Sequence, residues 1–561
     1  MHTGWKKRIS AALLALGMVL MLAPAAFAET TVWNGSAADG FSGGTGAEDD
    51  PFLILTAEQL KYFADRVGSG DDFRGKYVVL GANILLNDTA KWKSWDTTAP
   101  ANVWAPIGTF DCPFAGVFDG RGYYVSGVYM DAEENCLGLF GYAQNAVITG
   151  VGVEKSFIRG SYQIGGVLGC NIVTGGKSEV VDCCFAGDLR GIESVAGGVV
   201  GYCHVSDGGV LTVKNCLNEG SVSGGSDVGG VVGCVYVIEA DATVDHCRNT
   251  GKVSGEGWLV GGVVSVIDAS DGTVTVTGCC NTGNVTGGGY VGGVIGFGEA
   301  IDGGKTEVRV CYNTGDVLGE SGIGGVVGSQ YSPSGTVAVA CCYNTGDVSG
   351  KESVGGVVGS NEAYAFDGGA GKAGVTDCYS IGVVCGTVFV GGVIGNNSAD
   401  GEGSAAVPEN CYYRSDYVED GKSVPQYGIG CDAQGEANAD ISGQTAGLTA
   451  EEMQRAESFA AFDFEAVWSM EGNPAYSYPE LSDVPMVKGN PAAWEIKTGD
   501  VNGSDSLDAY DYQMLKAYVL GTLKNVSGRM KKNMDINHDK KIDSYDYQML
   551  KAAVLGTYTI K

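Results

Sequence analysis

The sequence is poor in histidine, proline and basic residues. It has four histidines and 12 prolines among 561 residues. No Ser/His/Asp set, zinc motif or phosphate loop is visible, and we interpret His204 and His246 as turn or strand residues. The 92 glycines show no three-residue period, which excludes collagen, and an apolar fraction of 44% excludes a disordered tail.

Positive charge is also scarce. The chain has 35 Lys and Arg residues and 66 Asp and Glu residues, which gives a formal net charge of −31. Such a chain repels nucleic acid and anionic lipid, so we expect neither as a partner. It favours cations, and calcium is the obvious extracellular one.

The first 28 residues have the pattern of a secretory signal peptide. Lys6, Lys7 and Arg8 precede an apolar run, and Ala26-Phe27-Ala28 is a small-x-small cleavage site. A membrane anchor is the alternative, but no second flanking charge follows. No other apolar run reaches about 18 residues, so we expect a secreted, extracellular protein without membrane insertion.

A repeat with a period near 32 residues dominates the chain. Two glycines followed by two apolar residues recur at Gly165, Gly197, Gly229, Gly261, Gly292, Gly324, Gly355 and Gly391. Each unit holds three β-branched runs separated by glycine and Asp-Gly turns, which is strand chemistry. A propeller blade would need about 40 or more residues. We therefore predict an all-β fold, a β-solenoid with one coil of about 32 residues per repeat.

Stacking of equivalent positions on successive coils explains the other markers. Asn218, Asn249, Asn281, Asn313 and Asn344 are predicted to form an amide ladder at a bend. The glycine two residues after each asparagine is expected to supply a positive φ. A column of cysteines, among them Cys216, Cys247 and Cys279, is expected to be buried. We expect free thiols, because stacked side chains point the same way; disulfides between neighbouring coils are the alternative.

The segments from Leu137 to Gly141 (LGLFG), IGGVLG, VGGVVG and VGGVIG resemble the GLUG-motif repeats of bacterial surface and secreted proteins. That family includes adhesins, so the resemblance bears on fold more than on activity. Thr56 and Gln59 are expected to begin a short helix in a cap over the first coil. The segment 448–462 has a helical pattern and is expected to help cap the last coil.

Two similar segments close the chain. Residues 510–517 and 545–552 are identical, and each copy follows a loop with oxygen side chains at calcium-ligand spacing. The predicted metal ligands of the first loop are Asp500, Asn502, Ser504, the Ser506 carbonyl, Asp508 and Asp511, and those of the second are Asp535, Asn537, Asp539, the Lys541 carbonyl, Asp543 and Asp546.

These segments resemble a type I dockerin, the small all-α calcium-binding module that attaches cellulosome proteins to a cohesin. The resemblance implies two calcium ions, a cohesin of a scaffoldin as the partner, and two binding orientations. The cohesin-binding residues that it implies are Ala509, Tyr510, Lys516, Ser544, Tyr545 and Lys551. Ser504 replaces an aspartate and Asp505 and Lys540 replace a glycine, so we expect weaker calcium binding in the first loop. A calcium-stapled helix pair without a partner is the alternative.

The predicted domains are a signal peptide (1–28), an N-terminal cap region (29–98), GLUG-like repeats (99–415), a C-terminal cap region (416–482), a linker (483–496) and the dockerin (497–561).

The solenoid itself offers two candidate ligand sites. Tyr312, Tyr343, Tyr379 and Tyr412 each follow a column cysteine, and strand alternation places them on the outer face as a sugar-stacking strip. A structural aromatic ladder is the alternative. Four aspartates precede glycines: Asp207, Asp271, Asp302 and Asp367. We interpret them as turn residues; the alternative is that they are the carboxylates of a groove.

Two functions therefore stand. The first is a non-catalytic component that binds carbohydrate, a cell surface or a protein through the flank of the solenoid. The second is a polysaccharide hydrolase or lyase on a β-helix, since most dockerin-bearing proteins are enzymes of plant-polysaccharide catabolism. The uniformity of the repeats favours the first, because catalytic β-helices carry their acids on a few irregular coils.

Overall fold

The computed structural model describes residues 32–419 without a break. It then describes 422–423, 425, 427–431, 437–440, 443–470 and 477–484, and, near the C-terminus, 498–499, 501, 507, 512, 515–516, 518–520, 534–537, 539, 541–555 and 557–558. The predicted signal peptide lies outside these residues. Within them, no helix is long and apolar enough to cross a membrane.

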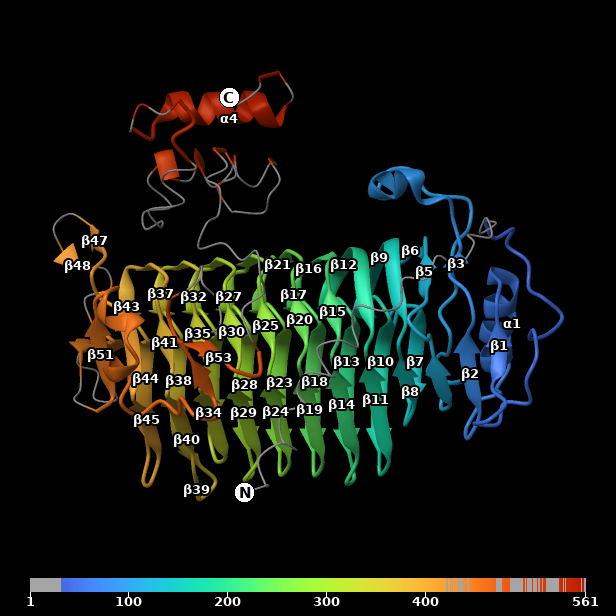
Figure 1. Cartoon of the computed structure of the whole chain (residues 1–561), viewed down its shortest axis with the longest axis horizontal. Coiled ribbons are helices and arrows are strands. Elements are labelled where there is room, and N and C mark those ends of the chain that lie inside the picture. The colour runs from blue at the N-terminus through green and yellow to red at the C-terminus, as the bar shows by residue number, and fades with distance from the viewer. Residues whose placement is uncertain are drawn as a thin grey trace, which may run out of the picture.

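The chain forms a β-solenoid with three parallel sheets along its length, so the predicted fold class is confirmed (Figure 1). Sheet I contains β1 (Phe52–Ile54), β2 (Tyr77–Leu80), β4 (Val117–Asp119), β8 (Val147–Thr149), β11 (Lys177–Val181), β14 (Val210–Lys214), β19 (Asp241–Asp245), β24 (Thr273–Thr277), β29 (Lys305–Arg309), β34 (Thr336–Ala340), β40 (Lys372–Thr376) and β45 (Ala405–Glu409).

Sheet II follows the Gly-Gly corner of each coil. It contains β7 (Phe140–Gln144), β10 (Leu168–Thr174), β13 (Val200–Ser206), β18 (Val232–Ile238), β23 (Val264–Ser270), β28 (Ile295–Ile301), β33 (Val327–Ser332), β38 (Val358–Phe366), β44 (Ile394–Asp400) and β49 (Ile429–Cys431), with β39 (Gly369–Ala370) and β50 (Ala437–Ala439) as antiparallel additions.

Sheet III has up to three short strands per coil, except that β9 and β12 are single strands of 14 residues each. Its members are β3 (Ile84–Leu85), β5 (Tyr124–Ser126), β6 (Tyr129–Asp131), β9 (Gly152–Gly165), β12 (Cys184–Gly197), β15 (Leu217–Asn218), β16 (Ser221–Gly224), β17 (Ser226–Gly229), β20 (Arg248–Asn249), β21 (Val253–Gly255), β22 (Trp258–Gly261), β25 (Cys280–Asn281), β26 (Val285–Thr286), β27 (Gly289–Gly292), β30 (Tyr312–Asn313), β31 (Val317–Leu318), β32 (Ser321–Gly324), β35 (Tyr343–Asn344), β36 (Val348–Ser349), β37 (Glu352–Gly355), β41 (Tyr379–Ser380), β42 (Val384–Cys385), β43 (Val388–Gly391), β46 (Cys411–Arg414) and β51 (Thr445–Leu448).

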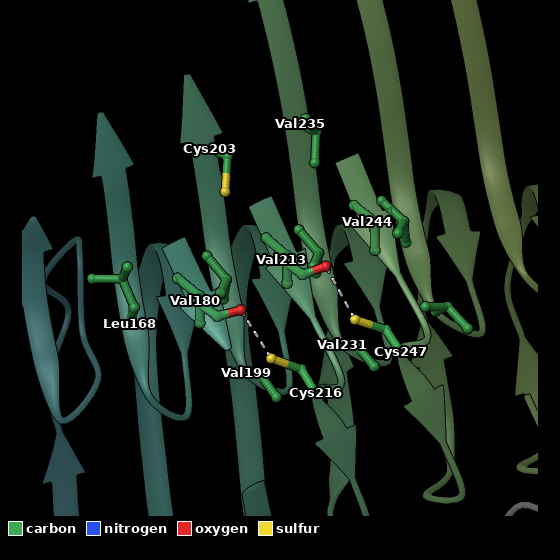
Figure 2. Packing of buried hydrophobic residues seen from close by; sticks show 14 of the residues in the cluster. Leu168, Val180, Val199, Cys203, Val213, Cys216, Val231, Val235, Val244 and Cys247 are labelled. Atoms are coloured by element: carbon green, nitrogen blue, oxygen red, sulfur yellow. Dashed lines mark hydrogen bonds between the residues drawn. The ribbon is translucent and has the colours of Figure 1, made fainter. Parts of the chain in front are cut away.

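One apolar core runs through all the coils. Its cysteines at the entry to sheet III are fully buried, and all 18 cysteines are free thiols, as expected. Figure 2 shows two rungs: the Cys216 and Cys247 thiols donate to the Val180 and Val213 carbonyls at 3.5 and 3.6 Å. Burial raises the pKa of the Cys378 and Cys411 thiols well above the usual range, which disfavours the reactive thiolate.

The predicted asparagine ladder is confirmed. The side-chain amide of each asparagine donates to the side-chain oxygen of the next: the distances are 2.7 Å from Asn218 to Asn249, from Asn249 to Asn281 and from Asn281 to Asn313, and 2.8 Å from Asn313 to Asn344. Asn344 ends the series on the Ser380 hydroxyl at 3.3 Å. Because all five asparagines are fully buried, the ladder satisfies polar groups that water cannot reach.

The role predicted for the glycine after each asparagine is wrong. Gly251, Gly283 and Gly315 do not have a positive φ. A Cβ on Gly251 would instead lie 1.8 Å from the Gly220 carbonyl oxygen of the preceding coil. The glycines of the Gly-Gly pairs also lie too close to backbone for a side chain, since a Cβ on Gly261 would lie 1.8 Å from the Val264 carbonyl oxygen. Glycine is therefore required by the close approach of backbones, not by its conformational freedom.

The two ends differ. At the N-terminal end, α1 (Ala57–Gly68) covers the first coil (Figure 1). Its N-cap is Thr56, whose hydroxyl accepts from the Gln59 backbone amide at 3.4 Å, and its Phe63 ring packs against Phe114 and Phe118. A turn of 3-10 helix, η1 (Thr89–Ser94), follows.

At the C-terminal end, the prediction of a helical segment over 448–462 is wrong. That segment forms only two 3-10 turns, η2 (Glu452–Gln454) and η3 (Ala456–Ser458), followed by the hairpin-like pair β52 (Trp468–Ser469) and β53 (Glu480–Leu481). A second pair, β47 (Val418–Glu419) and β48 (Lys422–Ser423), projects from the last coil.

Replacing Asn281 with alanine is expected to destabilise the solenoid. The change leaves the buried Asn249 amide and the Asn313 side-chain oxygen without their partner, at about 1–3 kcal/mol for each group. Thr275→Ala, on the outer face of β24, is the matched control and should change the unfolding free energy by about 0.5 kcal/mol or less. Urea unfolding measures both, and equal midpoints would show that the ladder does not contribute to stability.

Candidate functional site

The two C-terminal segments pair through equivalent residues. Tyr512 and Tyr547, which are 35 residues apart, stack at 5.2 Å between ring centroids, and their hydroxyls lie 3.1 Å apart. Leu515 and Leu550 are equivalent in the same way, and both are fully buried in one small core. The duplicated sequence therefore folds as two halves that meet on like residues.

The second loop is the better described half. Its N-cap residue, Asp543, precedes α4 (Ser544–Val554) and forms a capping box with Asp546. The buried Asp546 carboxylate accepts from the Ile536 amide at 2.8 Å and the Asp543 amide at 2.9 Å. It thus closes the loop onto the start of the helix, with its charge at the positive end of the helix dipole.

The start of the same loop is bent onto itself. The Asp539 amide donates to Asp535 Oδ1 at 3.1 Å and to Asn537 Oδ1 at 3.0 Å, and the Lys541 amide donates to Asp539 Oδ1 at 2.8 Å. The accepting atoms in this loop are all side-chain oxygens, the ligand atoms that a hard cation such as calcium prefers. In the part of the chain that the structure describes, no three His, Cys, Asp or Glu side chains lie close enough together to form a metal cluster.

The predicted ligands and contact residues of the first loop, residues 500, 502, 504, 506 and 508–511, lie outside the described residues. Of the predicted cohesin contacts that are described, Ser544, Tyr545 and Lys551 lie on α4 and are exposed, and the Tyr545 side chain is 62% exposed. Lys516 is exposed on the equivalent helical segment. The described members of the set are thus free to meet a partner.

Comparison with known protein families agrees with this geometry. Residues 498–555 match the dockerin type I domain family. A dockerin implies docking to a cohesin in a cellulosome-type assembly, and type I dockerins generally bind calcium. Dockerin proteins are typically extracellular components of such assemblies.

Two further similarities are weaker. A Gly-rich membrane protein of Evansella cellulosilytica is 28% identical over 146 residues, which are 25% of this chain and 15% of that protein. This chain therefore spans far less than two thirds of that relative. A crystal structure described as an immunoglobulin A1 protease from Bacteroides ovatus is 17% identical and covers 79% of this chain and 95% of its own, with a TM-score of 0.29, too low to support an argument.

The tyrosine strip expected on the outside of the solenoid is not exposed. Tyr312, Tyr343 and Tyr379 stack on one another, with ring centroids 5.1 and 5.2 Å apart, and all three are fully buried. They do point away from the core of the coils, as strand alternation requires. The expectation failed because the C-terminal strap, residues 449–470 and 477–484, covers them (Figure 1).

The strap supplies an apolar layer of its own. The ring centroid of Trp468 lies 5.7 Å from that of Tyr379 and 4.7 Å from that of Phe462. The Tyr379 hydroxyl donates to the Pro479 carbonyl. Tyr412 is partly buried against Phe459, at 4.9 Å between ring centroids. The four tyrosines are therefore the solenoid side of an internal interface, which is the structural alternative raised for them.

The aspartates before glycine are turn residues, as interpreted. Asp207, Asp271, Asp302 and Asp367 have φ values of 55°, 45°, 50° and 48° in the turns that connect sheet II to sheet I. Aspartate tolerates this left-handed conformation better than most residues do.

Replacing Tyr343 with alanine is expected to destabilise the C-terminal coils. The ring is buried between Tyr312 and Tyr379 and beneath Trp468, so its loss should cost about 3–5 kcal/mol of unfolding free energy. Tyr162→Ala, at an exposed tyrosine, is the control. Chemical denaturation of both variants tests the interface, and an unchanged midpoint for Tyr343→Ala would show that the strap does not cover the tyrosines in solution.

Proposed function

We propose that this protein is a secreted component of a cellulosome-type complex. Its dockerin attaches it to a cohesin of a scaffoldin, and its β-solenoid, built from GLUG-like repeats, is carried as a binding module for carbohydrate, a cell surface or a protein. Docking is supported by the match to the dockerin family and by the pairing of the two copies, in which Tyr512 stacks on Tyr547 and Leu515 and Leu550 share one core. An export signal in residues 1–28 fits this location.

Two calcium sites are part of the proposal. The second loop would hold one ion through Asp535, Asn537, Asp539, the Lys541 carbonyl, Asp543 and Asp546, and the first loop would hold another through Asp500, Asn502, Ser504, the Ser506 carbonyl, Asp508 and Asp511. A bound ion supplies the positive charge that lets several carboxylates lie together. Because the module has a small core, its fold should depend on that charge.

The equivalence of the two halves supports binding in two orientations. Tyr510 and Tyr545 occupy the same place in the two copies, as do Lys516 and Lys551. A cohesin that reads one copy would therefore find the same contacts on the other after a half-turn of the dockerin. Ala509 and Ser544 differ between the copies, which allows the two orientations to differ in affinity.

Removal of calcium is expected to abolish cohesin binding by the full chain. Isothermal titration calorimetry against a type I cohesin should give binding in calcium, loss in excess EGTA, and recovery when calcium is restored. Asp546→Ala should weaken binding by about tenfold or more, because it opens the loop at the start of α4 and so disturbs the core that the two copies share. Undiminished binding in EGTA would contradict a calcium-dependent dockerin.

The two-orientation proposal is tested with alanine variants at Tyr510 and Tyr545. Either single variant should bind the cohesin within about threefold of the natural chain, because the other copy remains intact, whereas the double variant should bind about a hundredfold more weakly or not at all. Loss of binding in one single variant alone would show that a single orientation is used.

A further inference from the structure

The outer face of sheet II differs in charge from that of sheet I. Strands β10 to β44 of sheet II contain no lysine or arginine. Sheet I, by contrast, carries Lys177, Lys214, Lys305, Arg309 and Lys372 on its strands. Both sheets share the same core and repeat, so stacking does not explain the difference.

Aromatic side chains gather on this outer face. Trp258, at the end of sheet III, is 53% exposed and meets Tyr290 edge to face at 5.1 Å between ring centroids. Tyr290 stacks on Phe297 of β28 at 5.5 Å. On the neighbouring coils, Tyr202 and Tyr236 lie 5.7 Å apart. The rings thus form a platform that crosses several coils in the direction of the solenoid axis.

The platform rests on a small apolar layer outside the main core. Val195, Cys234 and Val266 are buried there beneath Tyr202, Tyr236, Leu259 and Phe297. The corner residues Leu259 and Tyr290 adopt φ values of 64° and 48°, the left-handed conformation found before the Gly-Gly pair of every coil from Gly165 to Gly391. Rings held by strands and by a packed layer lose little freedom when a ligand binds.

Two carboxylates stand beside the rings. Strand register gives one column in the order Tyr236, Asp268, Glu299, Tyr331, each on the next coil. Neighbouring members are therefore about 4.8 Å apart along the axis. Among the described residues, neither Asp268 nor Glu299 has a hydrogen-bond or ion-pair partner, although both are half-buried. Burial raises the pKa of both, and the Asp268 charge further raises that of Glu299.

Rings that alternate with acceptor oxygens suit a sugar chain. A pyranose ring offers an apolar face of C–H groups to an aromatic ring and hydroxyl donors at its rim to a carboxylate. The absence of basic residues and the two carboxylates disfavour an acidic polysaccharide by repulsion. A platform that is long in one direction favours an extended chain over a compact partner.

We propose that the outer face of sheet II, from β18 to β33, binds an uncharged polysaccharide along the solenoid axis. Trp258, Tyr290 and Phe297 stack on its sugar rings, and Asp268 and Glu299 accept hydrogen bonds from its hydroxyls. This inference rests on the proposed function, in which the solenoid binds carbohydrate, a cell surface or a protein; it selects carbohydrate and assigns the binding to one face.

The test uses the full chain and calorimetry with soluble xyloglucan, galactomannan and mixed-linkage β-glucan as uncharged probes, and polygalacturonate as the acidic probe. At least one uncharged polysaccharide should bind, with little dependence on salt, and polygalacturonate should not. The double variant Trp258→Ala/Phe297→Ala should weaken binding by about tenfold or more. Asp268→Asn/Glu299→Gln, which preserves shape, should weaken it by about threefold to tenfold. Phe366→Ala, at an exposed ring on the β38–β39 hairpin, is the matched control and should bind as the natural chain does.

Unfolding curves and cohesin binding, measured on the same samples, confirm that each variant is folded. Binding of an uncharged polysaccharide that neither double variant weakens would overturn the assignment to sheet II and leave the proposed function standing. If none of the polysaccharides binds, both the assignment and the carbohydrate-binding function are wrong. Binding of poly-L-lysine that depends on Asp268 and Glu299, without binding of any uncharged polysaccharide, would identify the face as a site for a basic protein and overturn the proposal.

Discussion

The strand residues of each coil lie directly over their counterparts in the next coil, at the spacing of a parallel sheet, and the rest of the solenoid follows from this stacking. A buried position therefore favours a side chain that packs well against a copy of itself. Asparagine meets this condition because its amide has both a donor and an acceptor, and the buried ladder from Asn218 to Asn344 uses both. Cysteine meets it because it is small and apolar. Glycine meets it at Gly251 and Gly261, where backbones approach too closely for a Cβ.

The outer positions are released from this constraint, and there the coils differ from one another. Sheet I alternates basic residues with threonine and acids, whereas sheet II has rings and carboxylates without lysine or arginine. On the third side, the tyrosines from Tyr312 to Tyr412 are covered by the C-terminal strap, whose buried Trp468 and Leu481 complete a second core. Regular stacking thus fixes the scaffold, and the exceptions to regularity mark where the scaffold meets its own tail or, on our proposal, a ligand.

Much of this could be predicted from the period alone. The spacing of the Gly-Gly pairs, with three β-branched runs per unit, predicted the solenoid, and the recurrence of Cys and of Asn predicted a buried column and an amide ladder. The fate of the tyrosines could not be predicted, because alternation shows that Tyr343 points away from the coil but not that Trp468, more than a hundred residues later, covers it. The acidic and aromatic column on sheet II was missed because Tyr236, Asp268 and Glu299 do not repeat; its signal was the lack of lysine and arginine in every run after a Gly-Gly pair. In the dockerin, the duplication predicted which residues are equivalent, whereas the contact between Tyr512 and Tyr547 required coordinates.

On our proposal, a solenoid held together by its own ladders carries a docking module whose fold depends on calcium. Hydrogen–deuterium exchange of the full chain, with calcium and with excess EGTA, separates the behaviour of the two parts. Amides of 217–411 are expected to remain equally protected in both conditions, because the ladders involve no ion, whereas protection should be lost within 498–555 in EGTA. Loss of protection throughout the solenoid in EGTA, or unchanged protection of 498–555, would contradict it.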